Sequence, residues 1–360
     1  MKKAWLEINF EDLRTNYKII KDLDPKKDVL AVVKADAYGC GVIEFTKELV
    51  KMGVKHFGVS CLQEAIELRH QGIKEEILVF GAVLYDEYEQ AFENDIQISV
   101  SRDEDIEYIE SNNFLNPKVQ MKIDTGMGRI GFSPEKGMKW LNRRGELKKT
   151  QIIGVFTHFS CADMPEEDNY TLMQIEKFKP FENMKDLKYI HSQNSGGVIR
   201  FSDRCKGNIV RPGIMLYGYS DLISGLKPVA RLKSIVTHVK TVEEDSYISY
   251  GKEYFAKVGT IIATVSIGYA DGYPRRFSNC GIMEINGIPC KVLGKVCMDV
   301  TMVEVPKEYE GKVKIGSEVD AFYGDMYEQF KSANVSPYEF LVGITQRVKR
   351  VYVKSNQDTK

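Results

Sequence analysis

The sequence lacks the features that mark several common protein classes. Its seven cysteines are odd in number and form no C-x-x-C pair, which favours reduced thiols over a disulfide framework or a zinc site, so we expect no metal. No apolar run approaches the length that spans a bilayer. The amino-terminal MKKAWLEINFEDL meets acidic residues before the apolar segment of a signal peptide can build. We therefore expect a cytoplasmic protein with no membrane partner.

An excess of either charge is also missing. The 360 residues contain 50 Lys and Arg against 51 Asp and Glu, and no long run of one sign is present. Electrostatic binding to nucleic acid depends on a positively charged surface, so we do not expect it here. The partner that remains is a small molecule.

Short β-branched runs alternate with longer segments whose apolar residues recur at every third and fourth position. The eight runs are 29–34, 56–60, 76–81, 96–101, 118–124, 151–158, 189–193 and 208–213. Such alternation is typical of a parallel sheet covered by helices, and eight runs predict a (β/α)8 TIM-like barrel in the α/β class. The competing doubly wound sheet would carry a Gly-x-Gly-x-x-Gly turn after an early strand, and no such turn follows one.

After about Pro228 the pattern changes to strand-like runs separated by turn signals such as Asn286-Gly287. We expect two domains, a barrel over residues 1–227 and a mainly-β domain over residues 228–360.

Reactive side chains stand at the ends of the predicted barrel strands, where such barrels have their active sites. Lys34 and His158 each end a run, Lys122 and Arg211 lie near the ends of the fifth and eighth runs, and Ser195 follows the seventh. Taken singly, each has an ordinary structural explanation, such as a solvated lysine or a surface ion pair. Together they suit a phosphorylated carbonyl cofactor, because lysine condenses with an aldehyde and backbone N–H groups bind phosphate.

Longer motifs resemble a known family. These are KADAYGCG, KIDTGMGRIGF, THFSCAD, NSGG, VRPGIMLYG, ISYGKEY, IGYADGYPR and KVCMDVTMV. They resemble, in order and over nearly the whole chain, the alanine racemase family of pyridoxal 5'-phosphate enzymes, which have an amino-terminal barrel and a carboxyl-terminal β-domain.

The resemblance implies a two-base reaction. Lys34 resembles the lysine that holds the cofactor and takes the α-proton of the D-enantiomer, and Tyr250 resembles the base for the L-enantiomer. Racemisation removes a proton from one face of a planar carbon and returns one to the other face, so it needs an acid–base group on each side.

Other positions receive roles only through the resemblance. Arg211 would contact the pyridine nitrogen of the cofactor, with His158 supporting it. Arg129 would bind the phenolic oxygen and the substrate carboxylate, and the backbone N–H of Met298 would meet the same carboxylate. Lys122 stands at a position that is often carbamylated.

The remaining expected contacts concern the phosphate and a second subunit. The residues expected at the phosphate are Tyr38, Ser195, Gly213, Ile214 and Tyr338. In the family, the tyrosine base and the CMD segment come from the partner in a homodimer, so Tyr250 and Met298 are expected to complete the site of another chain.

Substrate choice remains open at this stage. Tyr338 favours alanine, interconverted between L and D forms and used for peptidoglycan, whereas serine or a broader range of amino acids is the alternative. Two further alternatives are a pyridoxal-phosphate decarboxylase, which would be longer and carry a cysteine motif, and a pyridoxal-phosphate carrier, against which the second domain argues.

Overall fold

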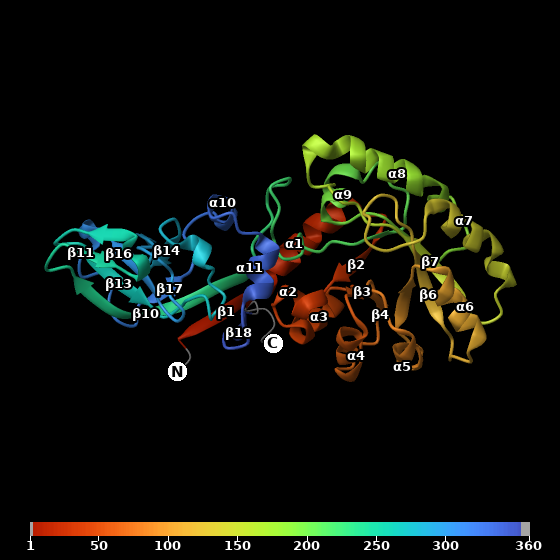
Figure 1. Ribbon diagram of the computed structural model, residues 1–360, viewed down its shortest axis with the longest axis horizontal. Helices are drawn as coiled ribbons and strands as arrows, with labels where there is room; N and C mark the ends of the chain where they lie inside the picture. The colour runs from red at the N-terminus through yellow and green to blue at the C-terminus, as the bar shows by residue number, and fades with distance from the viewer. Residues whose placement is uncertain (1–2, 354–360) are drawn as a thin grey trace. The chain divides into compact units, whose positions relative to one another are not determined.

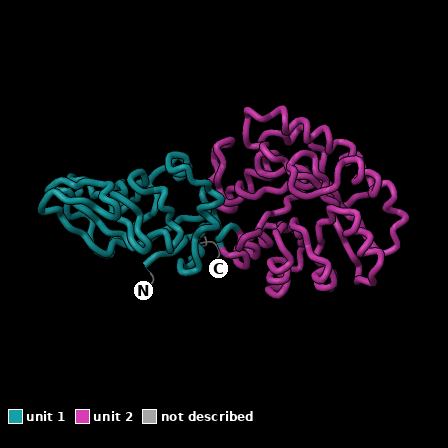
Figure 2. Tube along the Cα trace, viewed as in Figure 1, with its two compact units in different colours: residues 1–12, 38–40, 228–360 teal, residues 13–37, 41–227 magenta. Residues whose placement is uncertain are grey.

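The computed structural model describes residues 3–353, which form two compact units. Residues 13–37 and 41–227 make up the first, called here the barrel unit, and residues 1–12, 38–40 and 228–360 make up the second, the β-unit (Figure 2). Among the described helices, none is long and apolar enough to cross a membrane.

The barrel unit is built on eight parallel strands, each of which overlaps one of the eight predicted runs (Figure 1). They are β2 (Asp28–Val32), β3 (His56–Val59), β4 (Glu76–Val79), β5 (Gln97–Val100), β6 (Lys118–Lys122), β7 (Gln151–Phe156), β8 (Tyr189–His191) and β9 (Ile209–Val210). Their order is β8-β7-β6-β5-β4-β3-β2-β9, with every neighbouring pair parallel. The predicted barrel fold is confirmed.

The two outer strands of this order, β8 and β9, are joined by hydrogen bonds at the seam. The Asn208 N–H donates to the Ile190 carbonyl at 2.9 Å, and the Arg211 N–H donates to the Gln193 carbonyl at 2.9 Å. The Asn208 side chain also accepts from the Ile190 N–H at 2.9 Å. These bonds supply the edge groups with partners, so the sheet is nearly closed.

Helices follow the barrel strands along the chain. They are α2 (Lys34–Tyr38), which ends in the β-unit, α3 (Val42–Lys51), α4 (Leu62–His70), α5 (Tyr88–Glu93), α6 (Asp103–Ser111), α7 (Pro134–Arg143), α8 (Asp168–Glu182) and α9 (Ser195–Phe201), and α1 (Phe10–Leu23) precedes them. Four segments whose apolar spacing predicts a helix, 44–52, 62–71, 101–111 and 169–184, correspond to α3, α4, α6 and α8. That spacing works because one apolar face of each helix packs on the sheet.

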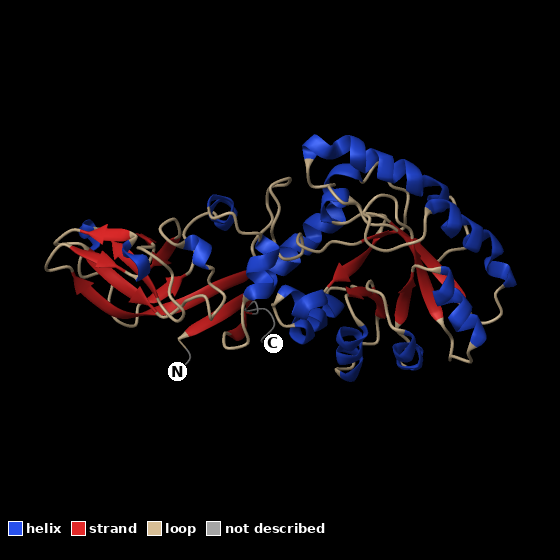
Figure 3. Cartoon of the chain, in the orientation of Figure 1, coloured by secondary structure: helices blue, strands red, loops and turns tan. Residues whose placement is uncertain are grey.

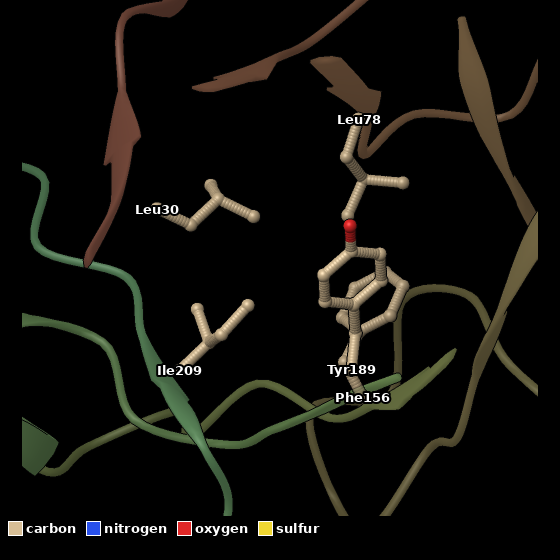
Figure 4. Packing of buried hydrophobic residues seen from close by; sticks show 5 residues of the cluster. All are labelled: Leu30, Leu78, Phe156, Tyr189 and Ile209. Atoms are coloured by element: carbon tan, nitrogen blue, oxygen red, sulfur yellow. The ribbon is translucent and has the colours of Figure 1, made fainter. Parts of the chain in front are cut away.

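The barrel interior is packed with side chains. Leu30, Leu78, Phe156, Tyr189 and Ile209 come from five strands and form one cluster, each at most 3% exposed (Figure 4). A cavity of about 10 Å³ beside them has room for about one water molecule. The barrel is therefore a core and not a pore.

The β-unit is dominated by strands (Figure 3). They are β1 (Ala4–Asn9), β10 (Ala230–Thr241), β11 (Ser246–Ile248), β12 (Tyr254–Ala256), β13 (Ile261–Val265), β14 (Ile282–Ile285), β15 (Ile288–Lys291), β16 (Thr301–Val305), β17 (Glu318–Asp320) and β18 (Lys349–Val353). Two short helices, α10 (Met326–Ser332) and α11 (Pro337–Gly343), accompany them.

The first strand differs from the expected domain division. The sequence analysis placed residues 1–12 in the barrel, but β1 pairs antiparallel with β10 and parallel with β18, inside the β-unit. Leu6 and Ile8 are fully buried on one face of β1. This pairing joins segments more than 200 residues apart, and no local pattern reports it.

Gly207 provides a test of the barrel seam. A Cβ at this position would lie 2.3 Å from the Ile190 carbonyl oxygen, which is backbone and cannot swing away. We expect Gly207→Ala to lower the free energy of unfolding by about 1–3 kcal/mol, measured as a lower midpoint of thermal unfolding by circular dichroism. Gly145→Ala is the control, because a Cβ there meets nothing within 4 Å. Equal midpoints for the two variants would contradict the assigned seam.

Candidate active site

Lys34 begins a left-handed turn. The sequence analysis ended the first strand on this lysine, whereas β2 ends at Val32 and residues 35–38 follow with φ angles of 53°, 55°, 50° and 52°. Four consecutive residues other than glycine in this region cost roughly 1–2 kcal/mol each. Such backbone persists only where its surroundings hold it, and it clusters at functional sites.

Two carboxylates hold the turn in place. Glu64 accepts from the Ala35 N–H at 2.6 Å, and its other oxygen accepts from the Ser60 N–H at 2.7 Å and the Ser60 hydroxyl at 2.9 Å. Asp36 accepts from the Val42 N–H at 2.7 Å, at the start of α3. The residue next to Lys34 is thus fastened to the segment that follows β3.

The surroundings of Lys34 lower the pKa of its amine. Partial burial is the main cause and the positive charge of Arg129 adds to it, while Glu64 acts in the opposite direction. A lowered pKa increases the fraction of uncharged amine, which is the form that attacks a carbonyl group.

Lys122 is nearly inaccessible, at 2% exposure, and donates to the Ile123 carbonyl at 3.0 Å. Burial, followed by the charges of Arg211 and Arg129, lowers its pKa to about 7, with Asp124 opposing them. The Asp124 carboxylate is itself occupied, because it accepts from the Gly126 N–H at 2.9 Å and the Gly128 N–H at 3.1 Å. Lys122 therefore has a substantial uncharged fraction near neutral pH.

Arg211 is buried at the seam of the barrel, with 3% exposure. Its guanidinium donates to the Thr157 carbonyl at 2.6 Å, to the Ser192 carbonyl at 3.0 Å and to Nδ1 of His191 at 2.8 Å. Burial lowers its pKa to about 9.

The histidine hydrogen-bonded to Arg211 is His191, which the sequence analysis did not select. His158 is an electrostatic neighbour of Arg211, and its pKa lies well below the usual value because it is buried among Arg211, Lys122 and Arg129. No hydrogen bond joins the His158 ring to Arg211 within residues 3–353. A signal for His191 was present, since it lies in the seventh run and ends strand β8.

Three of the residues expected at a phosphate group lie together. The Ser195 hydroxyl accepts from the Gly213 N–H at 3.1 Å, and Ile214 follows in the same turn. The chain passes so close here that a Cβ on Gly196 would lie 2.6 Å from the Asp163 nitrogen. The glycine pair after Ser195 therefore permits a close backbone approach.

The β-unit brings together the two motifs that carry Tyr250 and Met298. The Ser249 hydroxyl donates to the Lys295 carbonyl at 2.6 Å and lies 3.5 Å from the Cys297 sulfur. The backbone around Tyr250 is strained, with φ of 65° at Ser249 and 54° at Lys252. Tyr250 is 68% exposed and Met298 52% exposed within this chain.

The β-unit also pairs the other two tyrosines, Tyr38 and Tyr338, whose ring centroids are 5.9 Å apart. Burial, and then the neighbouring Tyr338, raises the pKa of the Tyr38 hydroxyl, which therefore stays protonated. Gly39 allows this approach, because a Cβ there would lie 2.3 Å from the Leu341 carbonyl oxygen.

The donor set of the barrel unit fits a small anionic ligand. Arg129 acts electrostatically on Lys34, Arg129 and Arg211 act on Lys122, and all four cations act on His158. Glu64 and Asp124 are the carboxylates that oppose these cations at Lys34 and Lys122. Within the described residues, no group of three or more His, Cys, Asp or Glu could hold a metal ion. Fold and site define a (β/α)8 barrel that carries a lysine of lowered pKa and a group of cations, followed in the chain by a β-unit.

Comparisons with known proteins agree with this class. Residues 8–221 match the family model for the alanine racemase amino-terminal domain, and residues 229–352 match the model for its carboxyl-terminal domain. An alanine racemase of Fusobacterium nucleatum is 39% identical, covering 98% of this chain and all of that protein, and one of Methanococcus maripaludis is 37% identical, covering 97% and 98%. The chain belongs to the alanine racemase family.

Solved structures give the same result. An alanine racemase of Clostridium difficile 630 has a TM-score of 0.89 at 34% identity, covering 99% of this chain and 97% of that one. The alanine racemase of E. faecalis has a TM-score of 0.88 at 31% identity, covering 98% of each chain.

The influence of Glu64 on Lys34 can be measured. In Glu64→Gln the amide oxygen can still accept from the Ala35 N–H, but the negative charge that raises the Lys34 pKa is gone, so this pKa falls further. We expect the pH profile of Lys34 reductive methylation, followed by mass spectrometry, to shift to lower pH. Glu67→Gln, on the exposed side of α4, should leave the profile unchanged. An unshifted profile in Glu64→Gln would contradict the assigned electrostatics.

Proposed function

We propose that this protein is a pyridoxal 5'-phosphate-dependent racemase that interconverts L-alanine and D-alanine. The observation that carries the proposal is Lys34, an amine whose pKa is lowered by burial and by Arg129, on a strained turn at the carboxyl end of a barrel strand. Relatives named alanine racemase over the full length of the chain support the substrate. Bound at Lys34, the cofactor supplies an electron-withdrawing ring that acidifies the α-proton of an amino acid.

The chain supplies two proton carriers in this proposal. The Lys34 amine takes the α-proton from D-alanine, and its lowered pKa keeps a fraction of it uncharged and ready to do so. Tyr250 takes the proton from L-alanine on the opposite face. The strained backbone on both sides of Tyr250 fits a residue whose hydroxyl must be held in one direction.

Binding is assigned to the cations and to backbone groups. Arg211 would contact the pyridine nitrogen of the cofactor and, as a cation, would disfavour protonation of that nitrogen. His191 is the histidine that is hydrogen-bonded to Arg211, and His158 is an electrostatic neighbour. Arg129 and the backbone N–H of Met298 hold the substrate carboxylate. The residues assigned to the phosphate are Ser195, Gly213 and Ile214, which lie together in the barrel unit, and Tyr38 and Tyr338, whose rings are neighbours in the β-unit.

Lys122 is assigned a carbamate. An uncharged amine adds to the carbon of CO₂ and releases one proton, which leaves a carboxylate on the nitrogen. With a pKa near 7, Lys122 has a substantial uncharged fraction at neutral pH, and Arg129 and Arg211 are the cations that act on it. The carbamate would replace the destabilised, buried Lys122 cation with an anion that Arg129 and Arg211 stabilise.

A homodimer with shared sites completes the proposal. The hairpin of β11 and β12 exposes Tyr247 and Phe255, whose rings pack 5.1 Å apart, close to the exposed Tyr250. Grouped exposed aromatic side chains are typical of an interface. If a second copy of the chain covers this hairpin, Tyr250 and Met298 of the first copy would complete the site around Lys34 of the second copy.

The test of the function is racemisation by the purified, cofactor-loaded protein. D-alanine should form from L-alanine in a coupled assay, and Lys34→Ala should lower the rate by about 10²–10⁴-fold, since an acid–base group is lost. Lys139→Ala, an exposed lysine on α7, should retain the wild-type rate. Serine and other L-amino acids belong in the same panel, because turnover of serine alone would retire alanine as the substrate.

Shared sites predict complementation between two inactive chains. A heterodimer of Lys34→Ala and Tyr250→Phe, isolated through two different affinity tags, contains one site with both bases intact and one with neither. We expect about half of the wild-type activity per dimer, because each site acts on its own. The same dimer would be inactive if Lys34 and Tyr250 of one chain served the same site.

The carbamate predicts a signal from labelled CO₂. Wild-type protein equilibrated with ¹³C-bicarbonate should show one carbamate resonance in its ¹³C spectrum, and Lys122→Met should lack it. Lys118→Met, on the same strand with its lysine paired to Asp95, is the control and should retain the resonance. A spectrum without the resonance in the wild-type protein would remove the assignment.

A further inference from the structure

A chain of side-chain hydrogen bonds leads from Arg211 across the interior of the barrel. His191 meets Arg211 through Nδ1 at 2.8 Å, and its Nε2 lies 2.6 Å from Oε1 of Gln120. Nε2 of Gln120 donates to Oε1 of Gln97 at 2.6 Å, and Nε2 of Gln97 donates to the carboxylate of Glu76. None of the motifs that indicate the family contains Gln120, Gln97 or Glu76.

The chain connects the two ends of the barrel. His191 is the last residue of β8, Gln120 is the middle residue of β6, and Gln97 and Glu76 are the first residues of β5 and β4. His191, Gln120 and Gln97 are at most 2% exposed. Three polar side chains buried this deeply cost several kcal/mol unless each is hydrogen-bonded.

The direction of the hydrogen bonds is fixed at both ends. A guanidinium has donors only, so Nδ1 of His191 must accept, and the ring proton must then be on Nε2. The Nε2 proton of His191 needs an acceptor, so Gln120 must present its amide oxygen to His191. The amide nitrogen of Gln120 then points towards Gln97, which must in turn present its own amide oxygen. At the other end an ionised carboxylate has acceptors only, so Gln97 must present its nitrogen to Glu76. Both ends demand the same direction.

The charges at the ends support this direction. Hydrogen bonds from Lys188 and Gln97 keep the pKa of Glu76 below its usual value although burial opposes them, and the Lys188 amine lies 2.9 Å from the carboxylate. Complete burial, followed by the charge of Arg211, holds the pKa of His191 well below its usual value. The histidine is neutral and the carboxylate is charged, as the chain requires.

We propose that Gln120, Gln97 and Glu76 are positioning residues that hold His191 as the neutral tautomer protonated on Nε2, and thereby keep Arg211 in one orientation. With the opposite tautomer, an N–H would face the guanidinium and the hydrogen bond to Arg211 would be lost. The effect on catalysis rests on the proposed function, in which Arg211 contacts the cofactor. The tautomer of His191 does not depend on the proposed function.

The tautomer is measured directly by ¹⁵N NMR of full-length protein labelled on its five histidines. The His191 signals are assigned by their loss in His191→Asn. The wild-type protein should show a neutral ring with the proton on Nε2, with and without cofactor. A proton on Nδ1, or a doubly protonated ring, overturns the proposal.

Variants test the role of the amides. Gln120→Met is nearly isosteric and removes the acceptor for His191, so both tautomers should appear, and kcat should fall about tenfold with KM changed less than about twofold. Gln97→Met should act in the same direction with a smaller loss, and it decides the matter if Gln120→Met does not fold. Ser99→Ala is the control on β5, because it removes a buried hydrogen bond to the Val79 carbonyl without touching the chain.

The outcomes separate this inference from the proposed function. Wild-type tautomer signals and wild-type kcat in both Met variants overturn the positioning role even if the protein racemises alanine. The expected tautomer and its loss in Gln120→Met, in a protein that turns over no amino acid, support the positioning role and overturn the proposed function.

Discussion

The constraint on which the barrel unit depends is the burial of the Arg211 charge. An arginine is almost never fully buried without partners, because removing its charge from water costs several kcal/mol. Here the guanidinium is satisfied by two backbone carbonyls and one imidazole, and its own backbone N–H helps to close the seam between β8 and β9. One residue therefore joins barrel closure to the electrostatics of the site.

Burial together with the positive charges of Arg129 and Arg211 explains three lowered pKa values in the barrel unit. Lys122, Lys34 and His158 all have lowered pKa values, with burial as the first cause and neighbouring cations as the second. Such a group of partly buried cations is destabilising, and perturbed pKa values of this kind cluster at functional sites. The packed apolar side chains of the barrel interior offset the free energy that the buried cations cost.

Backbone strain marks the two residues proposed as bases. A left-handed run of four residues follows Lys34, and positive φ angles flank Tyr250. In the barrel unit, the Glu64 carboxylate binds the strained segment at the Ala35 N–H. In the β-unit, the Ser249 hydroxyl binds the strained segment to the Lys295 carbonyl. Strain of this kind restricts where the reactive group can point.

Much of this could be read from the residues alone. Eight β-branched runs located all eight barrel strands, because strands buried on both faces need continuous apolar residues whatever their neighbours are. The rule that barrel sites lie at the carboxyl ends of strands selected Lys34, Lys122, His158 and Arg211. The sequence also contained the long motifs that indicate the family, since those depend only on residue order.

The tertiary structure decided what depends on partners distant in the chain. It moved β1 into the β-unit through pairing with β10 and β18, and it turned the chain after Lys34 into a left-handed turn held by Glu64. It also identified His191 as the hydrogen-bonded partner of Arg211 and revealed the amides behind it. Hydropathy and spacing in the sequence indicate which side chains are buried. The direction of a hydrogen bond depends on whether the partner atom is a donor or an acceptor, and only the folded chain brings that partner into contact.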